Sequence, residues 1–224
     1  MDKNIFIACD VSSQKEILKL LTEIQEEISG IKIGLQYITR RSPKEIKALT
    51  KFNKPIFYDG KFFDIKNTLV ESIKSLKDLN VSYATVHLLN GLEALKAANE
   101  TANKVGIKLL GVSVLTSFDN KDLDQLGFKD KTEQQVIRLI KIANEANLFG
   151  VICSPLEINM IKKIAPNLKC FTPGIRQDEN KNDQKRTMSA KQALEAGSDC
   201  LIIGRPITQG DPKKNIQKIL SSLK

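Results

Sequence analysis

Short apolar runs alternate with amphipathic stretches along almost the whole chain. Eight runs have the length and composition of strands buried on both faces of a sheet, and they span residues 4–10, 30–34, 55–60, 83–88, 107–115, 150–153, 169–172 and 200–204. Helices are predicted over 13–28, 44–51, 66–79, 91–104, 131–147, 155–164 and 211–224. Strands that alternate with helices in this order predict a parallel α/β sheet.

The number of strands and the chain length favour one particular architecture. Eight strand–helix units in 224 residues fit a single-domain TIM (β/α)8 barrel over residues 1–224, with an open doubly wound sheet as the alternative. No apolar run approaches the ~20 residues that a membrane span needs. The chain starts directly with a strand pattern and lacks the apolar stretch of a signal peptide. We therefore expect a cytoplasmic protein with no membrane partner.

The composition changes this picture little. The net charge of +9 is compatible with nucleic-acid binding, with attraction of an anionic small substrate, or with a lysine-rich solvated surface. The lysines are scattered along helices without interleaved aromatic residues, which favours the solvated surface and predicts no nucleic-acid partner. The four cysteines show no C-x-x-C spacing and lie in or beside apolar runs, so we expect buried free thiols and no zinc site.

Charged residues collect where the third predicted strand ends. The stretch Asp59-Gly60-Lys61-Phe62-Phe63-Asp64-Ile65-Lys66-Asn67-Thr68 follows an apolar run. Asp59 and Lys61 are two residues apart, so on a continuing strand they project from the same face, and Asp64 falls where a helix should begin. Opposite charges at this spacing hold each other ionised. The alternative is a solvated turn, because D-x-K-x-x-D alone is a weak signal.

In a barrel, all the strand ends open on one face, and that face is where such enzymes keep their chemistry. It would gather Asp10, Lys32, Asp59, Lys61, Asp64, His87, Thr116, the loop 173–186, Gly204 and Arg205. Arg176 and Arg205 are placed for the phosphate site that usually follows strands seven and eight. His87, the single histidine, lies in an apolar run and is predicted to be structural. Without a histidine–acid partner for Ser113, Thr116 or Ser117, a Ser/His/Asp hydrolase is not expected.

A set of motifs, taken in order, resembles the short bacterial form of the orotidine 5′-monophosphate decarboxylase family. The resemblance covers nearly the whole chain, and the order and spacing of the motifs make it specific. It is carried by Ala8-Cys9-Asp10, Ile31-Lys32-Ile33-Gly34, the D-x-K-x-x-D-I-x-N-T run of 59–68, Val86-His87, Val114-Leu115-Thr116-Ser117, Val151-Ile152-Cys153-Ser154, Thr172-Pro173-Gly174-Ile175-Arg176, Asp183-Gln184-Lys185-Arg186 and Ile203-Gly204-Arg205-Pro206-Ile207.

The resemblance implies a reaction and a role for each matching residue. The reaction would convert orotidine 5′-monophosphate to UMP and CO2 in a homodimer with shared active sites, without a metal or organic cofactor. The catalytic charge network would be Lys32, Asp59, Lys61 and Asp64. Asp64 would come from the second protomer, accompanied by Ile65 and Thr68. The remaining substrate contacts would be Asp10 and Lys32 at the ribose, Thr116 near the pyrimidine, Gln184 and Arg205 at the phosphate, and Pro173, Arg176 and Gly204 close by.

Two departures from the family pattern concern loop shapes. Lys66 stands where the family usually has proline, and Leu89-Asn90 replaces a small, glycine-rich pair after the histidine.

Related sugar-phosphate decarboxylases and aldolase-like lyases share D-x-K-x-x-D but use Mg²⁺, with a glutamate near the position of Lys32; the lysine argues against that reading. A non-catalytic basic binding protein would rest on the net charge alone and would leave the strand-end charges unexplained.

Overall fold

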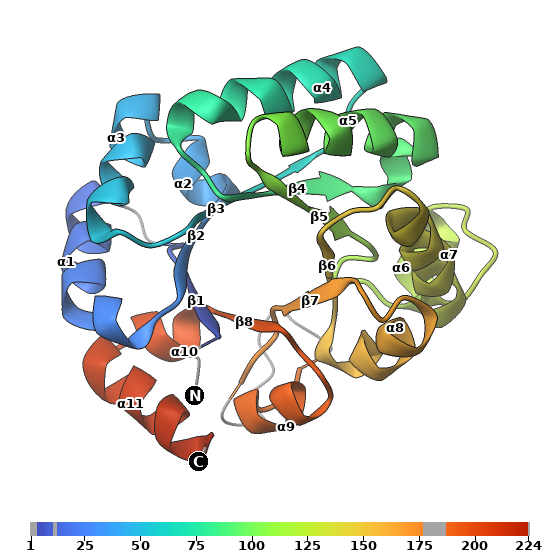
Figure 1. Ribbon diagram of the computed structural model, residues 1–224. Helices are drawn as coiled ribbons and strands as arrows, with labels where there is room; N and C mark the ends of the chain where they lie inside the picture. Colours follow the sequence, from blue (N-terminus) through green and yellow to red (C-terminus); the bar gives the residue numbers. More distant parts are fainter. Residues whose placement is uncertain (1–3, 11–12, 177–186, 224) are drawn as a thin grey trace.

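Eight parallel strands close into a barrel in which each strand pairs with its neighbours in sequence and β8 pairs with β1 (Figure 1). The structure, a computed structural model, describes residues 4–10, 13–176 and 187–223. The predicted (β/α)8 barrel is therefore confirmed, and the open sheet is excluded. The strands are β1 Ile5–Ala8, β2 Gly30–Gly34, β3 Ile56–Phe62, β4 Tyr83–His87, β5 Lys108–Val112, β6 Gly150–Ile152, β7 Lys169–Thr172 and β8 Cys200–Ile203.

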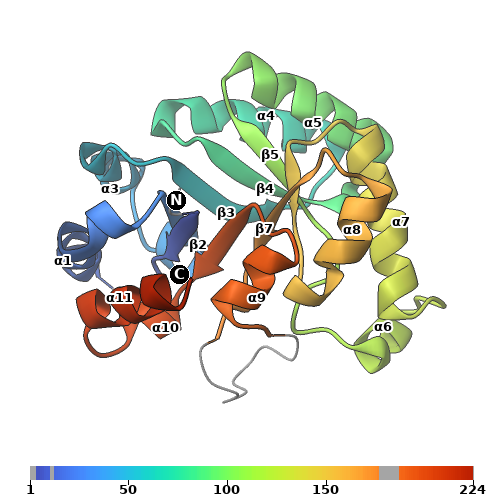
Figure 2. The same cartoon turned by 60° about the horizontal axis from the view of Figure 1, so that its bottom comes forward.

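The helices surround the ring of strands in both views (Figures 1 and 2). They are α1 Gln14–Ile24, α2 Leu35–Ile38, α3 Pro43–Lys47, α4 Lys66–Ser75, α5 Leu92–Lys104, α6 Asn120–Gln125, α7 Thr132–Glu145, α8 Ile158–Ile164, α9 Ala190–Glu195, α10 Arg205–Thr208 and α11 Pro212–Ser222. Short 3-10 turns extend several of them, among them η3 Leu76–Leu79, and η4 Leu88–Asn90 follows β4. Within the described residues, we find no helix that is both long and apolar enough to cross a membrane.

The structure departs from the predicted elements in short helices and at strand ends. The helices α2, α6, α9 and α10 were not predicted, because segments of four to six residues are too short to show a helical period. The fifth strand ends at Val112 instead of residue 115. Val114 and Leu115 were counted as strand because they are apolar, but they line the cavity at the barrel mouth.

Aromatic side chains fill part of the barrel interior. Phe6 of β1, Phe57 of β3 and Phe171 of β7 meet edge to face, with ring centroids 5.9–6.4 Å apart. They belong to a buried cluster that also contains Ala8, Leu110, Cys200 and Ile202. Contributions from alternate strands are the packing expected inside such a barrel. The packed interior supports the strand ends that carry the charged residues described below.

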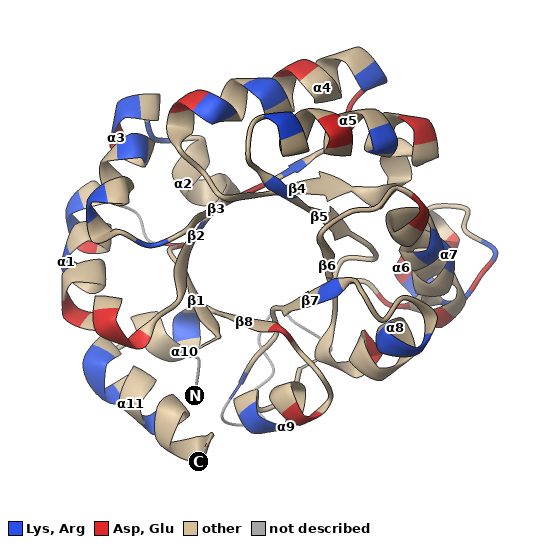
Figure 3. Ribbon diagram, in the orientation of Figure 1, with Lys and Arg blue, Asp and Glu red and all other residues tan. Residues whose placement is uncertain are grey.

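The outer surface carries charges of both signs. Lysines alternate with acidic residues along α4 and α5 (Figure 3). Lys104 and Glu100 on α5 form an ion pair with a nitrogen–oxygen distance of 2.7 Å, and both side chains are exposed. Inside, the four cysteines are buried free thiols, as the sequence predicted. The charge of these helices is therefore that of a solvated surface.

Candidate active site

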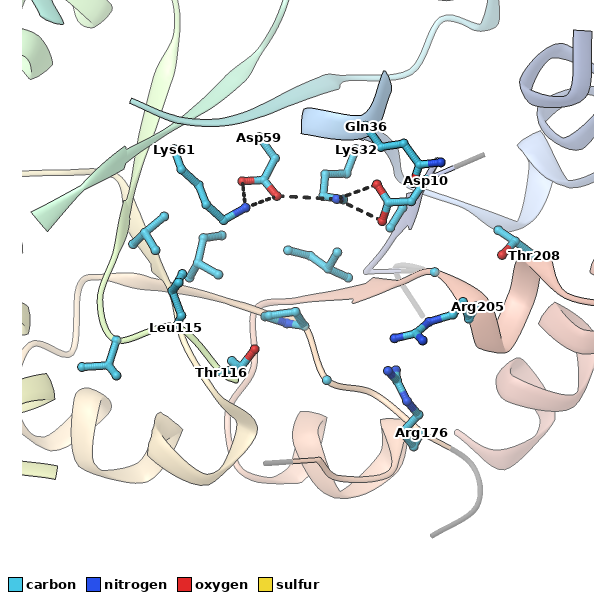
Figure 4. Close-up of a pocket in the computed structure, with 18 residues that line it drawn as sticks. Asp10, Lys32, Gln36, Asp59, Lys61, Leu115, Thr116, Arg176, Arg205 and Thr208 are labelled. Atoms are coloured by element: carbon cyan, nitrogen blue, oxygen red, sulfur yellow. Dashed lines mark hydrogen bonds and ion pairs between the residues drawn. The ribbon is translucent and has the colours of Figure 1, made fainter. Parts of the chain in front are cut away.

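A bulge near the end of β3 brings Asp59 and Lys61 together. Tyr58 pairs with Ala84 and Phe62 pairs with Val86, so three residues of β3 lie opposite one residue of β4. Lys61 itself has φ 48°, a left-handed conformation that few non-glycine residues adopt. The charged ends of the two side chains meet at 2.9 Å (Figure 4), whereas the sequence predicted only that both project from one face of a continuing strand. The bulge, rather than the regular alternation of a continuing strand, brings these two side chains together.

Thr85 of β4 holds this bulge in place. Its fully buried hydroxyl accepts a hydrogen bond from the Lys61 N–H at 2.8 Å and donates one to Oδ1 of Asp59 at 3.0 Å. One side chain thus fixes both the backbone of the lysine and the carboxylate of the aspartate. Thr85 does not stand out in the sequence, because it lies inside an apolar strand. Its hydroxyl in an otherwise apolar run was the only available signal.

The residue between the two charges is glycine for a steric reason. The rings of Tyr58 and Phe62 stack on each other, with centroids 5.7 Å apart and planes 4° from parallel. A Cβ at Gly60 would lie 2.8 Å from the Tyr58 ring, closer than such contacts occur. The stacked rings and the glycine therefore belong to one local structure that turns the chain between Asp59 and Lys61.

Four charged side chains from three neighbouring strand ends form a row of alternating sign. The Lys61 ammonium lies 2.9 Å from both carboxylate oxygens of Asp59. The Nζ of Lys32 in β2 lies 3.5 Å from Oδ2 of Asp59 and 3.3 Å from Oδ1 of Asp10, which follows β1 (Figure 4). The sequence predicted that these four residues gather at one face of the barrel, and they do come together.

Burial and pairing compete at the centre of this row. Burial raises the pKa of the Asp59 carboxyl, but the ammonium groups of Lys32 and Lys61 outweigh it and bring that pKa below its usual range. Burial also lowers the pKa of Lys32, and the carboxylates of Asp59 and Asp10 outweigh this effect, so the net shift is upward. With side chains only 9% and 12% exposed, Lys32 and Asp59 stay charged because they face each other.

The row forms part of the wall of a cavity of about 470 Å³ at the carboxyl ends of the strands. Nine predicted residues line it, namely Asp10, Lys32, Asp59, Lys61, Thr116, Pro173, Arg176, Gly204 and Arg205. The guanidinium groups of Arg176 and Arg205 point toward a common space, at some distance from Lys61 (Figure 4). Gln36 and Thr208 also line the cavity. Sequence analysis missed both because they lie in the short helices α2 and α10.

Three other predicted site residues lie outside this cavity. Asp64, Ile65 and Thr68 do not line the cavity but are exposed on the segment that joins β3 to α4 and on the first turn of α4. Ile65 is 74% exposed and Phe63 beside it 62%. The predicted phosphate ligand Gln184 lies outside the described residues.

His87 ends β4 beside this exposed segment. Its Nδ1 accepts a hydrogen bond from the Leu89 N–H at 3.3 Å, and its ring centroid lies 5.6 Å from that of Phe63. Burial and the Lys61 ammonium lower the pKa of the imidazole, which favours its neutral form. Both contacts fit the structural role predicted for this histidine.

Comparison with known proteins gives one consistent family. The model of the orotidine 5′-phosphate decarboxylase / HUMPS family matches residues 3–219. An orotidine 5′-phosphate decarboxylase of Wolbachia pipientis subsp. Culex pipiens is 37% identical, over 98% of this chain and 98% of its own. One of Carboxydothermus hydrogenoformans is 39% identical, over 92% and 90%. The crystal structure of the Lactobacillus acidophilus orotidine 5′-phosphate decarboxylase superposes with a TM-score of 0.86 at 30% identity, covering 99% of both chains.

The bulge gives a prediction about stability. Thr85→Val keeps the shape of the side chain but leaves the Lys61 N–H and the buried Asp59 carboxylate each without a hydroxyl partner, which should cost about 1–3 kcal/mol of unfolding free energy. Thr172→Val is the matched control, because Thr172 is equally buried and its hydroxyl bonds to that of Ser198, which can still donate to a backbone carbonyl. Urea unfolding of both variants should show the larger loss for Thr85→Val. Equal losses would mean that Thr85 does not hold the bulge.

Proposed function

The chain belongs to the orotidine 5′-phosphate decarboxylase / HUMPS family, and we propose that it converts orotidine 5′-monophosphate to UMP and CO2 in pyrimidine biosynthesis. The observation that carries this function is the row Lys61–Asp59–Lys32 in a cavity that also contains two arginines. The row offers an ammonium group where negative charge develops, and the arginines offer a site for a phosphate. We propose that residues 1–224 act as one catalytic domain in the cytoplasm, without a nucleic-acid partner.

Lys61 is the proposed catalytic acid. When the bond between C6 of the pyrimidine and the carboxylate breaks, the electron pair stays on C6, which has no neighbouring electron sink. An ammonium group held at C6 stabilises this charge and then donates its proton to the carbon. Asp59 holds Lys61 by two contacts of 2.9 Å, so the ammonium is oriented before the substrate arrives. Lys61 supplies both the charge and the proton, so the proposed step requires no metal or organic cofactor.

The other cavity residues would bind the parts of the substrate that do not react. Asp10 and Lys32, paired at 3.3 Å, suit the ribose hydroxyls, since one accepts and the other donates hydrogen bonds. Arg176 and Arg205 direct their planar guanidinium groups into one space, which suits a phosphate dianion. Thr116, Pro173 and Gly204 line the same cavity, where Thr116 would lie near the pyrimidine. Binding energy from the distant phosphate can be used to stabilise the transition state at C6.

The proposed active form is a two-fold dimer in which Asp64 completes the partner's site. Its support is the exposed segment that follows β3, where Phe63 and Ile65 present large apolar side chains beside Asp64 and Thr68. Exposed apolar patches of this kind mark interaction surfaces. In a closed two-fold assembly, the same segment of each chain contributes to the other chain's site. Asp64, Ile65 and Thr68 would then reach the substrate although they do not line the cavity of their own chain.

The first functional prediction concerns Lys61. Lys61→Ala should lower kcat by at least about 10²–10³-fold, because it removes a group that acts on the developing charge. UMP should still bind, since its ribose and phosphate contacts remain. Decarboxylation can be followed by the loss of orotate absorbance and UMP binding by calorimetry. Lys104→Ala on the exposed face of α5 is the control for the loss of a lysine. A Lys61→Ala protein within about tenfold of wild type would remove Lys61 from the mechanism.

The second prediction concerns the phosphate. Arg205→Ala should weaken binding of the phosphorylated substrate by about 2–5 kcal/mol, because it leaves a buried phosphate without its partner. Turnover of the unphosphorylated nucleoside should hardly change. The measurement is kcat/KM for both substrates, with Arg138→Ala on the exposed face of α7 as the control. An equal loss for nucleotide and nucleoside would show that Arg205 supports the fold and does not recognise phosphate.

The third prediction tests the shared site. Lys61→Ala and Asp64→Ala chains, each nearly inactive, are mixed in equal amounts, unfolded and refolded together. Random pairing makes about half of the dimers mixed, and each mixed dimer has one intact site of two, so about a quarter of wild-type activity should return. If Asp64 acts within its own chain, every site keeps a lesion. No recovery, with mixed dimers detected by mass spectrometry, would then exclude the shared site.

A further inference from the structure

The side chain of Asn90 binds three main-chain groups near the active site. Its Nδ2 donates hydrogen bonds to the carbonyl oxygens of Phe62 at 2.9 Å and His87 at 2.8 Å. Its Oδ1 accepts the Asp64 N–H at 3.1 Å. Asn90 therefore joins the end of β3 to the end of β4. Its amide bonds to the main chain on both sides of Phe63, at the Phe62 carbonyl and the Asp64 N–H.

These bonds bear directly on Asp64. Asp64 and its neighbours Phe63 and Ile65 are exposed, so packing within this chain does little to fix their positions. The carboxylate of Asp64 accepts the N–H of the next residue, Ile65, at 2.7 Å, which links side chain and backbone locally. The bond from Asn90 links that backbone to the barrel. Together with Thr85 at Lys61, it holds the chain at both ends of the stretch from Lys61 to Asp64.

We propose that Asn90 is a positioning residue that holds Asp64 at the geometry its catalytic role requires. The inference rests on the proposed function, since that function gives Asp64 its role. A displacement of about 1 Å in a catalytic group can lower the rate about 10²-fold. A side chain that fixes the Asp64 backbone can therefore control turnover without touching the substrate.

A double-mutant cycle between Asn90 and Asp64 tests the inference. Asn90→Ala should lower kcat about 10²-fold in the wild-type background. In the Asp64→Ala background it should cause no further loss, because there is no longer a carboxylate to position. Single-turnover reactions with excess enzyme measure the slow variants. Asn99→Ala is the control, since Asn99 also donates to two main-chain carbonyls, those of Ala146 and Asn147, away from the site. It should lower thermal stability and leave turnover unchanged.

A second variant separates the hydrogen bonds from the packing. Asn90→Asp keeps the size of the side chain and its acceptor for the Asp64 N–H, but it loses both donors. It should be impaired like Asn90→Ala, because a carboxylate repels the carbonyls of Phe62 and His87.

Three results would overturn the inference. The first is wild-type turnover in Asn90→Asp. The second is an equal loss from Asn90→Ala in both backgrounds, which would mean that Asn90 acts independently of Asp64. The third is wild-type turnover of Asp64→Ala itself, which would remove the proposed role of Asp64 and the inference with it. The first two leave the proposed function intact, so the two failures can be told apart.

Discussion

Asp59 keeps its negative charge in a place where burial alone would remove it, because two ammonium groups lie within 3.5 Å. For buried ions, both the cost of losing hydration and the attraction between opposite charges are large. Removing one partner therefore leaves an uncompensated charge at high cost. The three ions come from β2 and β3, and Asp10 extends the row to the end of β1. The row therefore depends on correct pairing of three strands, and it can form only when this side of the barrel is complete.

The sequence was sufficient for the architecture because the barrel follows from a repeated pattern. The bounds of β2 agree with the prediction to the residue, and the strand ends bring Lys32 and Asp59 together as expected. The bulge in β3 could not be predicted, since it depends on a hydroxyl from the next strand and on two stacked rings. Gln36 was missed because its helix has only four residues. The position of Asp64 relative to a partner involves a second chain, and a single sequence contains no pattern for it.

Two hydrogen-bonding side chains, one within β4 and one just after it, hold the stretch from Lys61 to Asp64. Thr85 within β4 fixes Lys61, and Asn90 just after β4 fixes Asp64. The stretch thus has little internal packing of its own but is held to an adjacent strand that is well buried. This arrangement lets polar groups stay exposed to a substrate or a partner while their backbone remains ordered. It also explains why β3 and β4 together, more than β3 alone, form the structural basis of the site.

The left-handed backbone of Lys61 has a consequence for how this protein can change. A non-glycine residue in that conformation is disfavoured by about 1–2 kcal/mol, a cost that glycine does not have. Glycine at this position would relieve the backbone, but it would also remove one of the two ammonium groups that keep Asp59 charged, so the backbone and the ion pair make opposite demands on this residue. Thermostable variants of this barrel would have to gain their stability elsewhere, and Lys61 would have to be held constant.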